Sequence, residues 1–151
     1  MIEVPGAPTD LISSLHDDLE QIAVIFERQL ASDHSFVNAL SVHVGSYRGK
    51  MLRPMMVLLC GKIGEHTPDD EVLHTLAAVV EMIHVSTLVH DDVLDEATIR
   101  RSIPTINTLH GNEMAVMLGD YLISNAYHLW ASLQNPYLND ALAGVTRKLC
   151  E

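Results

Sequence analysis

Residues 71–101 read EVLHTLAAVVEMIHVSTLVHDDVLDEATIRR, and this stretch decides the fold. It continues a helical pattern that starts at about Thr67 and Pro68, and nothing breaks that pattern before Asp95. At 1.5 Å per residue such a helix is roughly 40 Å long. The interior, TLAAVVEMIHVSTLV, is almost entirely apolar. An amphipathic surface helix would carry a polar stripe, so the composition predicts a central, buried helix.

The rest of the chain also follows the helical period, and no convincing alternating strand is visible. Further helices are expected at about 11–30, 35–45, 54–63, 105–131 and 137–151. The 151 residues suit one domain with a core of its own. The sequence therefore predicts an all-α fold.

Composition limits the possible partners and the location. The net charge of −11 argues against nucleic acid or an anionic membrane surface as a partner, so an anionic substrate would need local basic groups or metal ions. Cys60 and Cys150 lie far apart in helical patterns, which makes a disulfide framework improbable. No signal peptide is visible, and no apolar run approaches the ~20 residues of a membrane span. These features predict a cytoplasmic protein with no membrane span.

Three aspartates follow the apolar helix. Asp91 and Asp95 are four residues apart and share a helix face, with Asp92 one step round. Carboxylates this close repel one another unless a cation is shared, and hard oxygen ligands suit Mg²⁺ completed by water and phosphate oxygens. The alternative is a solvated acidic face, the interpretation given to HDDLE at 16–20. The pattern by itself leaves both possibilities open at residues 91–95.

Basic residues lie on both sides of this acidic cluster in the sequence. Lys50 and Arg53 come just before a helix that Pro54 is expected to open, and a helix N-terminus with two cations is a good anion site. Arg100 and Arg101 are adjacent, so they point in different directions and can serve two anions. His84, seven residues before Asp91, lies on nearly the same helix face. Two basic sites beside one acidic site predict two phosphorylated substrates that meet across Mg²⁺.

Three segments resemble the all-trans isoprenyl diphosphate synthases, the head-to-tail prenyltransferases. They are GKMLRP at 49–54, EMIHVSTLVHDDVLDEATIRRSIPTIN at 81–107 and AVMLGDYL at 115–122. The combination of D-D-x-x-D, R-R and an upstream G-K-x-x-R-P is specific, although any one part alone would be weak. The resemblance extends along nearly the whole chain.

The resemblance implies antiparallel helices around a central cavity, usually in a homodimer. It also implies an Mg²⁺-dependent reaction, in which an allylic diphosphate of farnesyl or geranylgeranyl type ionises and alkylates isopentenyl diphosphate. Carried over by motif, Asp91, Asp92 and Asp95 would hold Mg²⁺ on the allylic diphosphate beside Arg100. The isopentenyl diphosphate site would comprise Lys50, Arg53, His84 and Arg101.

One part of the family pattern is not found. The family has a Lys-Thr pair and a second aspartate-rich motif further along its chain, and nothing in residues 96–151 matches either. We therefore expect residues 1–151 to be the N-terminal portion of a single isoprenoid synthase domain. On that interpretation the chain alone is expected to be inactive.

The resemblance also bears on product length. In the family, bulky side chains about one turn before the first aspartate close the product tunnel. Ser86 and Thr87 occupy those positions and are small, which predicts a long-chain polyprenyl product. The alternative is that both residues only allow close helix packing.

Three other functions were weighed. Glu81-x-x-His84 and Glu71-x-x-His74 match the Glu-x-x-His element of di-iron bundles, but they lie ~15 Å apart on one helix and cannot share a centre. The short chain is consistent with a non-catalytic or split subunit of a heteromeric synthase. A purely accessory subunit, however, would not need the intact aspartate motif and both basic clusters. A terpene cyclase shares the aspartate motif, but it binds only one diphosphate.

Overall fold

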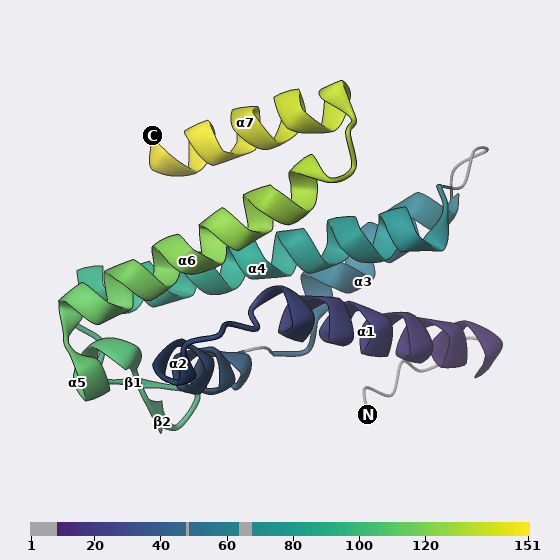
Figure 1. Ribbon diagram of the computed structural model, residues 1–151. Helices are drawn as coiled ribbons and strands as arrows, with labels where there is room; N and C mark the ends of the chain where they lie inside the picture. Colours follow the sequence, from purple (N-terminus) through teal and green to yellow (C-terminus); the bar gives the residue numbers. More distant parts are fainter. Residues whose placement is uncertain (1–8, 48, 64–67) are drawn as a thin grey trace.

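The computed structural model describes residues 9–47, 49–63 and 68–151, and this part of the chain is almost entirely helical, as predicted (Figure 1). A short hairpin interrupts the helices. The elements are α1 Thr9–Gln29, α2 Ser35–Gly45, α3 Leu52–Ile63, α4 Asp70–Leu94, β1 Ile99–Arg100, β2 Ile103–Pro104, α5 Ile106–His110, α6 Asn112–Ala131 and α7 Pro136–Cys150.

Helix α4 is the centre of the molecule, as its apolar sequence predicts. It packs against α1, α3 and α6, and α6 lies along its length (Figure 1). The expectation that no apolar run approaches the length of a membrane span is wrong by composition, because an 18-residue window of α4 has a mean hydropathy of 1.7. However, 56% of that segment is buried inside the molecule, as expected for the core helix of a packed domain.

The core has two parts, and α4 contributes to both. One joins α1, α2, α4 and α6 and includes Leu40, Val85 and Leu122. The other joins α1, α3 and α4 through Ile22, Leu58 and Ala77. Because α4 contributes to both parts, burial of its side chains organises the whole fold.

Several predicted boundaries need correction. The helix expected at 105–131 is divided into α5 and α6 at Gly111, whose φ of +85° lies in the region that glycine adopts most easily. Helix α3 begins at Leu52, so Pro54 lies inside its first turn and does not open it. The chain also contains the β1–β2 pair, which the helical period did not reveal. Thr67, the expected start of α4, lies outside the described residues.

The interpretation of residues 16–20 as a solvated acidic face is wrong for Asp18. This residue is only 8% exposed, and its carboxylate accepts hydrogen bonds from Lys62 Nζ at 2.7 Å and His74 Nε2 at 2.8 Å. Burial alone would raise the pKa of Asp18, but the two basic partners hold it below its ordinary value. Asp18 therefore links α1, α3 and α4 through charge.

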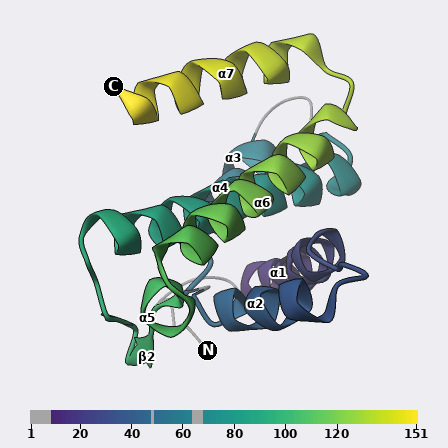
Figure 2. The same cartoon turned by 60° about the vertical axis from the view of Figure 1, so that its left-hand side comes forward.

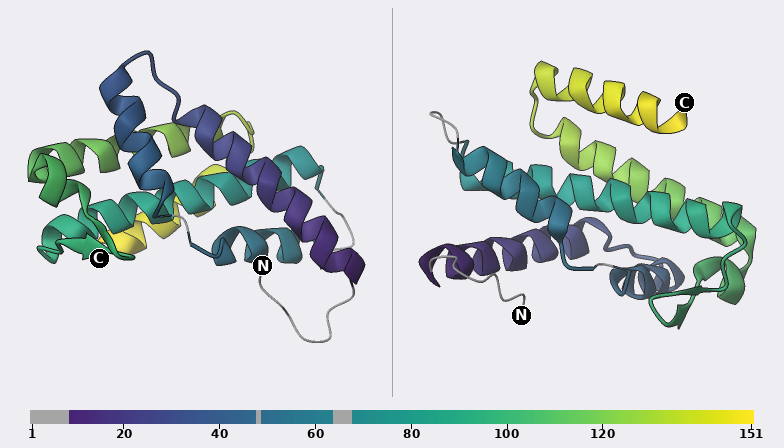
Figure 3. Two further views of the ribbon diagram at one scale, coloured as in Figure 1. Left: turned by 90° about the horizontal axis from the view of Figure 1, so that it is seen from below. Right: turned by 180° about the vertical axis from the view of Figure 1, so that it is seen from behind.

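Helix α7 lies at the edge of the molecule. It runs back along α6 but stands off from the bundle (Figures 2 and 3). Leu138 and Leu142, one turn apart, are the leucines of α7 that pack against the core, while Tyr137 and Val145 are exposed. This narrow contact leaves an open groove beside α6 and α7, which is described below.

Candidate functional site

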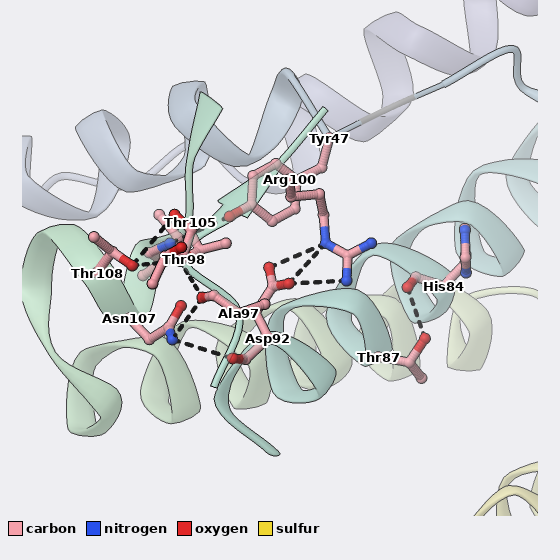
Figure 4. A network of polar contacts seen from close by, with 11 residues as sticks. Tyr47, His84, Thr87, Asp92, Ala97, Thr98, Arg100, Thr105, Asn107 and Thr108 are labelled. Carbon is pink, nitrogen blue, oxygen red and sulfur yellow. Dashed lines mark hydrogen bonds and ion pairs between the residues drawn. The ribbon is translucent and has the colours of Figure 1, made fainter. Parts of the chain in front are cut away.

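The C-terminal end of α4 and the hairpin that follows it bring Asp92 and Arg100 together (Figure 4). Arg100 Nη2 donates to Asp92 Oδ1 at 2.8 Å, and Arg100 Nε lies 2.9 and 3.1 Å from the two carboxylate oxygens. Asp92 is only 1% exposed, so the pair is largely shielded from water. The hydrogen bonds with Asp92 raise the pKa of Arg100 further above its ordinary value.

Two residues that the sequence did not single out hold this region in place. The Asn107 side-chain amide donates to the carbonyls of Asp92 and Ala97, at 3.1 Å each (Figure 4). The buried Tyr47 hydroxyl accepts from the Ile106 backbone N–H at 3.2 Å. Burial raises the pKa of Tyr47, and the charge of Asp92 adds to this rise. Asn107 and Tyr47 thus tie the loop between α4 and α5 to the aspartate motif.

The hairpin turn directs the two arginines to different neighbours. Arg101 and Ser102 have φ angles of 51° and 68°, a two-residue turn in the left-handed region that lets β1 and β2 pair tightly. The Arg100 guanidinium contacts Asp92, whereas that of Arg101 lies against Gly49. A Cβ atom added at Gly49 would collide with the Arg101 guanidinium. The glycine therefore allows Arg101 to lie beside the loop that carries Lys50.

His84 lies among these cations. It is half-buried on α4, and burial lowers the pKa of its imidazole below the ordinary value. The positive charges of Arg53, Arg101 and Arg100 lower this pKa further, while Asp91 acts in the opposite direction. Helix α3, the hairpin and α4 therefore bring Arg53, Arg101 and His84 into one basic cluster, which would favour an anion.

Lys50 stands at the edge of this basic cluster. It is exposed and lies two residues before Leu52, where α3 begins. Met51 between them has a φ of 53°, an uncommon conformation for a residue with a side chain. Arg53 is also exposed, on the first turn of α3. Two cations and the free N–H groups of a helix start thus face solvent together.

Asp91 and Asp95 are exposed at the end of α4, and neither has an ion-pair partner among the described residues. The three aspartates do not gather into one site: in the described part of the chain, no three His, Cys, Asp or Glu side chains are placed to hold a metal ion. The oxygen donors nevertheless fit Mg²⁺, which proteins commonly bind through one or two carboxylates completed by substrate phosphate oxygens. Asp92 could join them only after exchanging its partner Arg100.

An apolar groove of about 350 Å³ opens beside the basic cluster. Arg53 and His84 contribute to its lining, and the other lining side chains come from α4, α6 and α7: Val80, Ile83, Thr87, Trp130, Ala141, Leu142 and Val145. Its volume lies at the lower end of the range usual for small-molecule sites. A ligand with an anionic head and an apolar tail matches this combination.

The structure separates the two candidate chain-length residues. Thr87 lines the groove, and its hydroxyl donates to the His84 carbonyl within α4 at 2.8 Å (Figure 4). Ser86 is fully buried and donates to the Gly119 carbonyl of α6 at 2.9 Å. The contacts of Ser86 therefore fit a role in close helix packing. Thr87, in contrast, is in a position to touch a ligand in the groove.

The di-iron alternative finds no support in the described residues. His74 donates to the Asp18 carboxylate on α1, and Glu81 is buried in the core. His74 and Glu81 therefore lie in different surroundings, and the two Glu-x-x-His pairs do not form a shared metal site.

Comparison with known proteins gives the same family as the motifs. The model of the polyprenyl synthetase family matches residues 34–151. Component 2 of heptaprenyl diphosphate synthase from Geobacillus stearothermophilus is 35% identical over 140 residues, which is 93% of this chain and 43% of that protein.

Two solved structures have the same fold. A decaprenyl diphosphate synthase from Rhodobacter capsulatus has a TM-score of 0.80 at 33% identity, covering 91% of this chain and 42% of the other. A polyprenyl synthase from Caulobacter crescentus, complexed with calcium and isoprenyl diphosphate, has a TM-score of 0.83 at 28% identity, covering 97% of this chain and 44% of the other. The chain spans less than half the length of the curated relatives it matches.

Proposed function

The chain belongs to the polyprenyl synthetase family, and we propose that it supplies the first aspartate motif and the basic diphosphate site of a trans-prenyltransferase. In the proposed reaction an allylic diphosphate ionises, and its cation alkylates isopentenyl diphosphate to give a long-chain polyprenyl diphosphate. One observation carries this proposal: Arg53 and His84, which form a basic cluster with Arg101, also line an apolar groove.

The acidic end of α4 is assigned to the allylic diphosphate. Asp91 and Asp95 would hold Mg²⁺ there, and Asp92 would join them once Arg100 turns from its carboxylate to the diphosphate. Bound Mg²⁺ would neutralise the departing diphosphate during C–O cleavage. Arg100 would add a second positive charge on the same side. The relative from Caulobacter crescentus was solved in complex with both calcium and isoprenyl diphosphate, which supports a role for a divalent ion.

The basic cluster is assigned to isopentenyl diphosphate. Lys50 and Arg53 face solvent at the start of α3, and Arg101 reaches the same loop across Gly49. With His84 these groups give one anion site separate from the aspartates. A second diphosphate site is what distinguishes this proposal from a terpene cyclase.

The apolar groove is assigned to the hydrocarbon tail. Its apolar side chains would exclude water from the cation, which is the environment that an ionisation requires. We propose that Thr87 alone limits product length, because Thr87 lines the groove whereas Ser86 donates to the carbonyl of Gly119.

The proposal for Thr87 has a direct test. Thr87→Phe should weaken the affinity of the chain for farnesyl diphosphate about tenfold, since the ring would displace buried tail carbons. Circular dichroism should be unchanged. Thr87→Val keeps the size of the side chain and serves as the matched control. Equal affinities for Thr87→Phe and Thr87→Val would contradict the assignment.

The complete enzyme is proposed to be cytoplasmic, Mg²⁺-dependent and assembled as a homodimer. A heteromeric synthase is the alternative, and it draws support from the relative that is named as one component of its enzyme. In either case we propose that turnover needs the part of the family pattern that this chain does not match. Residues 1–151 would then bind both substrates without converting them.

Metal dependence tests the function itself. Calorimetric titration with farnesyl thiodiphosphate, an analogue that resists ionisation, should show binding that strengthens at least tenfold when Mg²⁺ is added. Asp91→Asn should remove this gain, whereas the control Asp17→Asn, at an exposed aspartate on α1, should keep it. An Mg²⁺ effect of equal size in Asp91→Asn would overturn the metal assignment.

A further inference from the structure

His90, the residue directly before the aspartate motif, faces helix α6. Its imidazole Nε2 lies 3.3 Å from the Val116 carbonyl oxygen and 3.6 Å from Asp120 Oδ1. Because a carbonyl can only accept a hydrogen bond, Nε2 carries a proton and donates it to Val116. The Asp120 carboxylate lies near the same nitrogen and favours this tautomer of the ring. His90 therefore joins the end of α4 to the first half of α6, which runs alongside it (Figure 1).

Gly119 makes room for the His90 ring. A Cβ atom added at Gly119 would collide with this imidazole, so the glycine allows the ring to lie against the backbone of α6. Ser86, one turn earlier on the same face of α4, donates to the Gly119 carbonyl at 2.9 Å. Two consecutive turns of α4 thus contact a single buried residue of α6. Such contacts restrict both the distance between the two helices and the rotation of α4 about its own axis.

Asp91 and Asp95 depend on this restraint more than Asp92 does. The Asp92 carboxylate is held directly by Arg100 (Figure 4). Asp91 and Asp95 are exposed, and neither has an ion-pair partner among the described residues. The positions of their carboxylates therefore follow the backbone of α4. Since Asp91 comes directly after His90 in the chain, a displacement of His90 would move Asp91 with it.

We propose that His90 is a positioning residue for the metal site of the proposed function, on which this inference rests. Its contact with Gly119 fixes the end of α4 so that the carboxylates of Asp91 and Asp95 can share one Mg²⁺. This ion requires a nearly ideal octahedral arrangement of oxygen ligands, so a small rotation of the helix end costs metal affinity. His90 itself points to α6 and acts only through the aspartates.

The two proposed diphosphate sites distinguish positioning from a general effect on the fold. Isopentenyl diphosphate is assigned to the basic cluster, where Arg53 comes from α3 and Arg101 from the hairpin. Neither residue belongs to the contact between His90 and Gly119. Affinity for isopentenyl diphosphate in the absence of Mg²⁺ therefore reports whether the chain is folded, independently of the aspartates.

The first test is His90→Ala, titrated calorimetrically with farnesyl thiodiphosphate in the presence and absence of Mg²⁺. The gain in affinity caused by Mg²⁺ should fall about tenfold, the lower end of what a metal site loses with a supporting residue. Affinity for isopentenyl diphosphate should stay within about twofold of the wild type, because that site is separate. His90→Gln can still donate to the Val116 carbonyl and should keep most of the gain. His128→Ala, at an exposed histidine of α6, is the matched control and should keep all of it.

Gly119 gives a second test. Gly119→Ala should displace the His90 ring and lower the Mg²⁺ gain of the otherwise wild-type chain. The same substitution should lower the gain little further in His90→Ala, where the ring is already gone. Non-additive losses of this kind are expected of two residues in contact. Additive losses would mean that the two residues act separately, and they would overturn the inference.

The outcomes separate this inference from the proposed function. An Mg²⁺ gain in His90→Ala equal to that of the wild type would overturn the inference and leave the proposed function intact. An equal loss of affinity for isopentenyl diphosphate would show that His90 only supports the fold, which also overturns the inference. If the wild-type chain shows no Mg²⁺ gain, the proposed metal assignment fails and the inference fails with it. A selective loss in His90→Ala, with retention in His90→Gln and His128→Ala, supports the inference.

Discussion

Asp92 and Arg100 are both expected to serve a diphosphate and its metal ion, yet each is bound to the other in the structure. Asp92 is buried and Arg100 is only partly exposed, and removing Arg100 would leave the carboxylate without its charged partner in a region of low dielectric. The ion pair therefore holds both side chains in position until a charged ligand replaces one of the two partners. The sequence predicted the residues but not their pairing, because spacing along a chain does not reveal which hairpin residue returns to α4.

Breaking this pair should lower stability. Arg100→Gln is expected to reduce the free energy of unfolding by about 3 kcal/mol, since it leaves Asp92 buried and unpaired. Urea denaturation measures the change. The control is Arg147→Gln, whose partner Glu151 is exposed four residues away, and the expected loss there is about 0.5 kcal/mol or less. Equal losses in the two variants would show that the buried pair does not hold the loop.

His84 makes a prediction about pH. Burial and the neighbouring arginines hold the pKa of His84 low in the free chain, and a bound diphosphate would raise it by adding negative charge. Binding should then take up a proton, so affinity should rise as the pH falls through 6.5, the ordinary pKa of histidine. Calorimetry in buffers of different ionisation enthalpy measures the uptake. Part of this proton uptake can come from the diphosphate itself, and His84→Gln should remove the rest. Unchanged proton uptake in that variant would contradict the assignment of His84 to the diphosphate site.

At the scale of elements, the long helix was the easiest feature to predict. An unbroken apolar run of this length has few other solutions, and α4 lies within a few residues of its predicted bounds. The β1–β2 hairpin was missed because its two-residue turn uses Arg101 and Ser102 at positive φ, where glycine or asparagine is the usual signal. Asn107 was missed for a related reason, because its two acceptors are backbone carbonyls that no sequence pattern identifies.

The charged link between α1, α3 and α4 predicts a second pH effect. Asp18 has a pKa below its ordinary 3.8, so the unfolded chain binds the proton more readily than the folded one. Its contribution to stability is therefore present above pH 3.8 and is lost as the pH falls through the lower pKa of the folded state.

The test compares Asp18→Asn with the wild type across pH. Asp18→Asn should lose about 2 kcal/mol near neutral pH, and the difference should vanish in strong acid. Asp17→Asn on the exposed face of α1 should stay within about 0.5 kcal/mol of the wild type. A difference for Asp18→Asn that persists unchanged in strong acid would mean that its charge is not the cause.

For the molecule as a whole, the sequence predicted the fold and the family. It did not predict how the acidic and basic side chains around α4 are arranged in space. The motifs placed the acidic and basic groups close together along the chain, but their arrangement depends on how α3 and the hairpin pack beside α4. The groove depends on α7, whose narrow contact through Leu138 and Leu142 cannot be deduced from its amphipathic pattern. Side-chain packing between distant segments is the part that sequence reasoning cannot supply.

If two diphosphates bind at separate sites beside α4, both should be bound at once, and a calorimetric titration measures this. Isopentenyl diphosphate is added to the chain already saturated with Mg²⁺ and farnesyl thiodiphosphate. We expect one further bound ligand per chain without release of the farnesyl analogue, and loss of that binding in the double variant Arg53→Gln, Arg101→Gln. Displacement of the analogue by isopentenyl diphosphate, or no second binding event, would mean that the chain has a single diphosphate site.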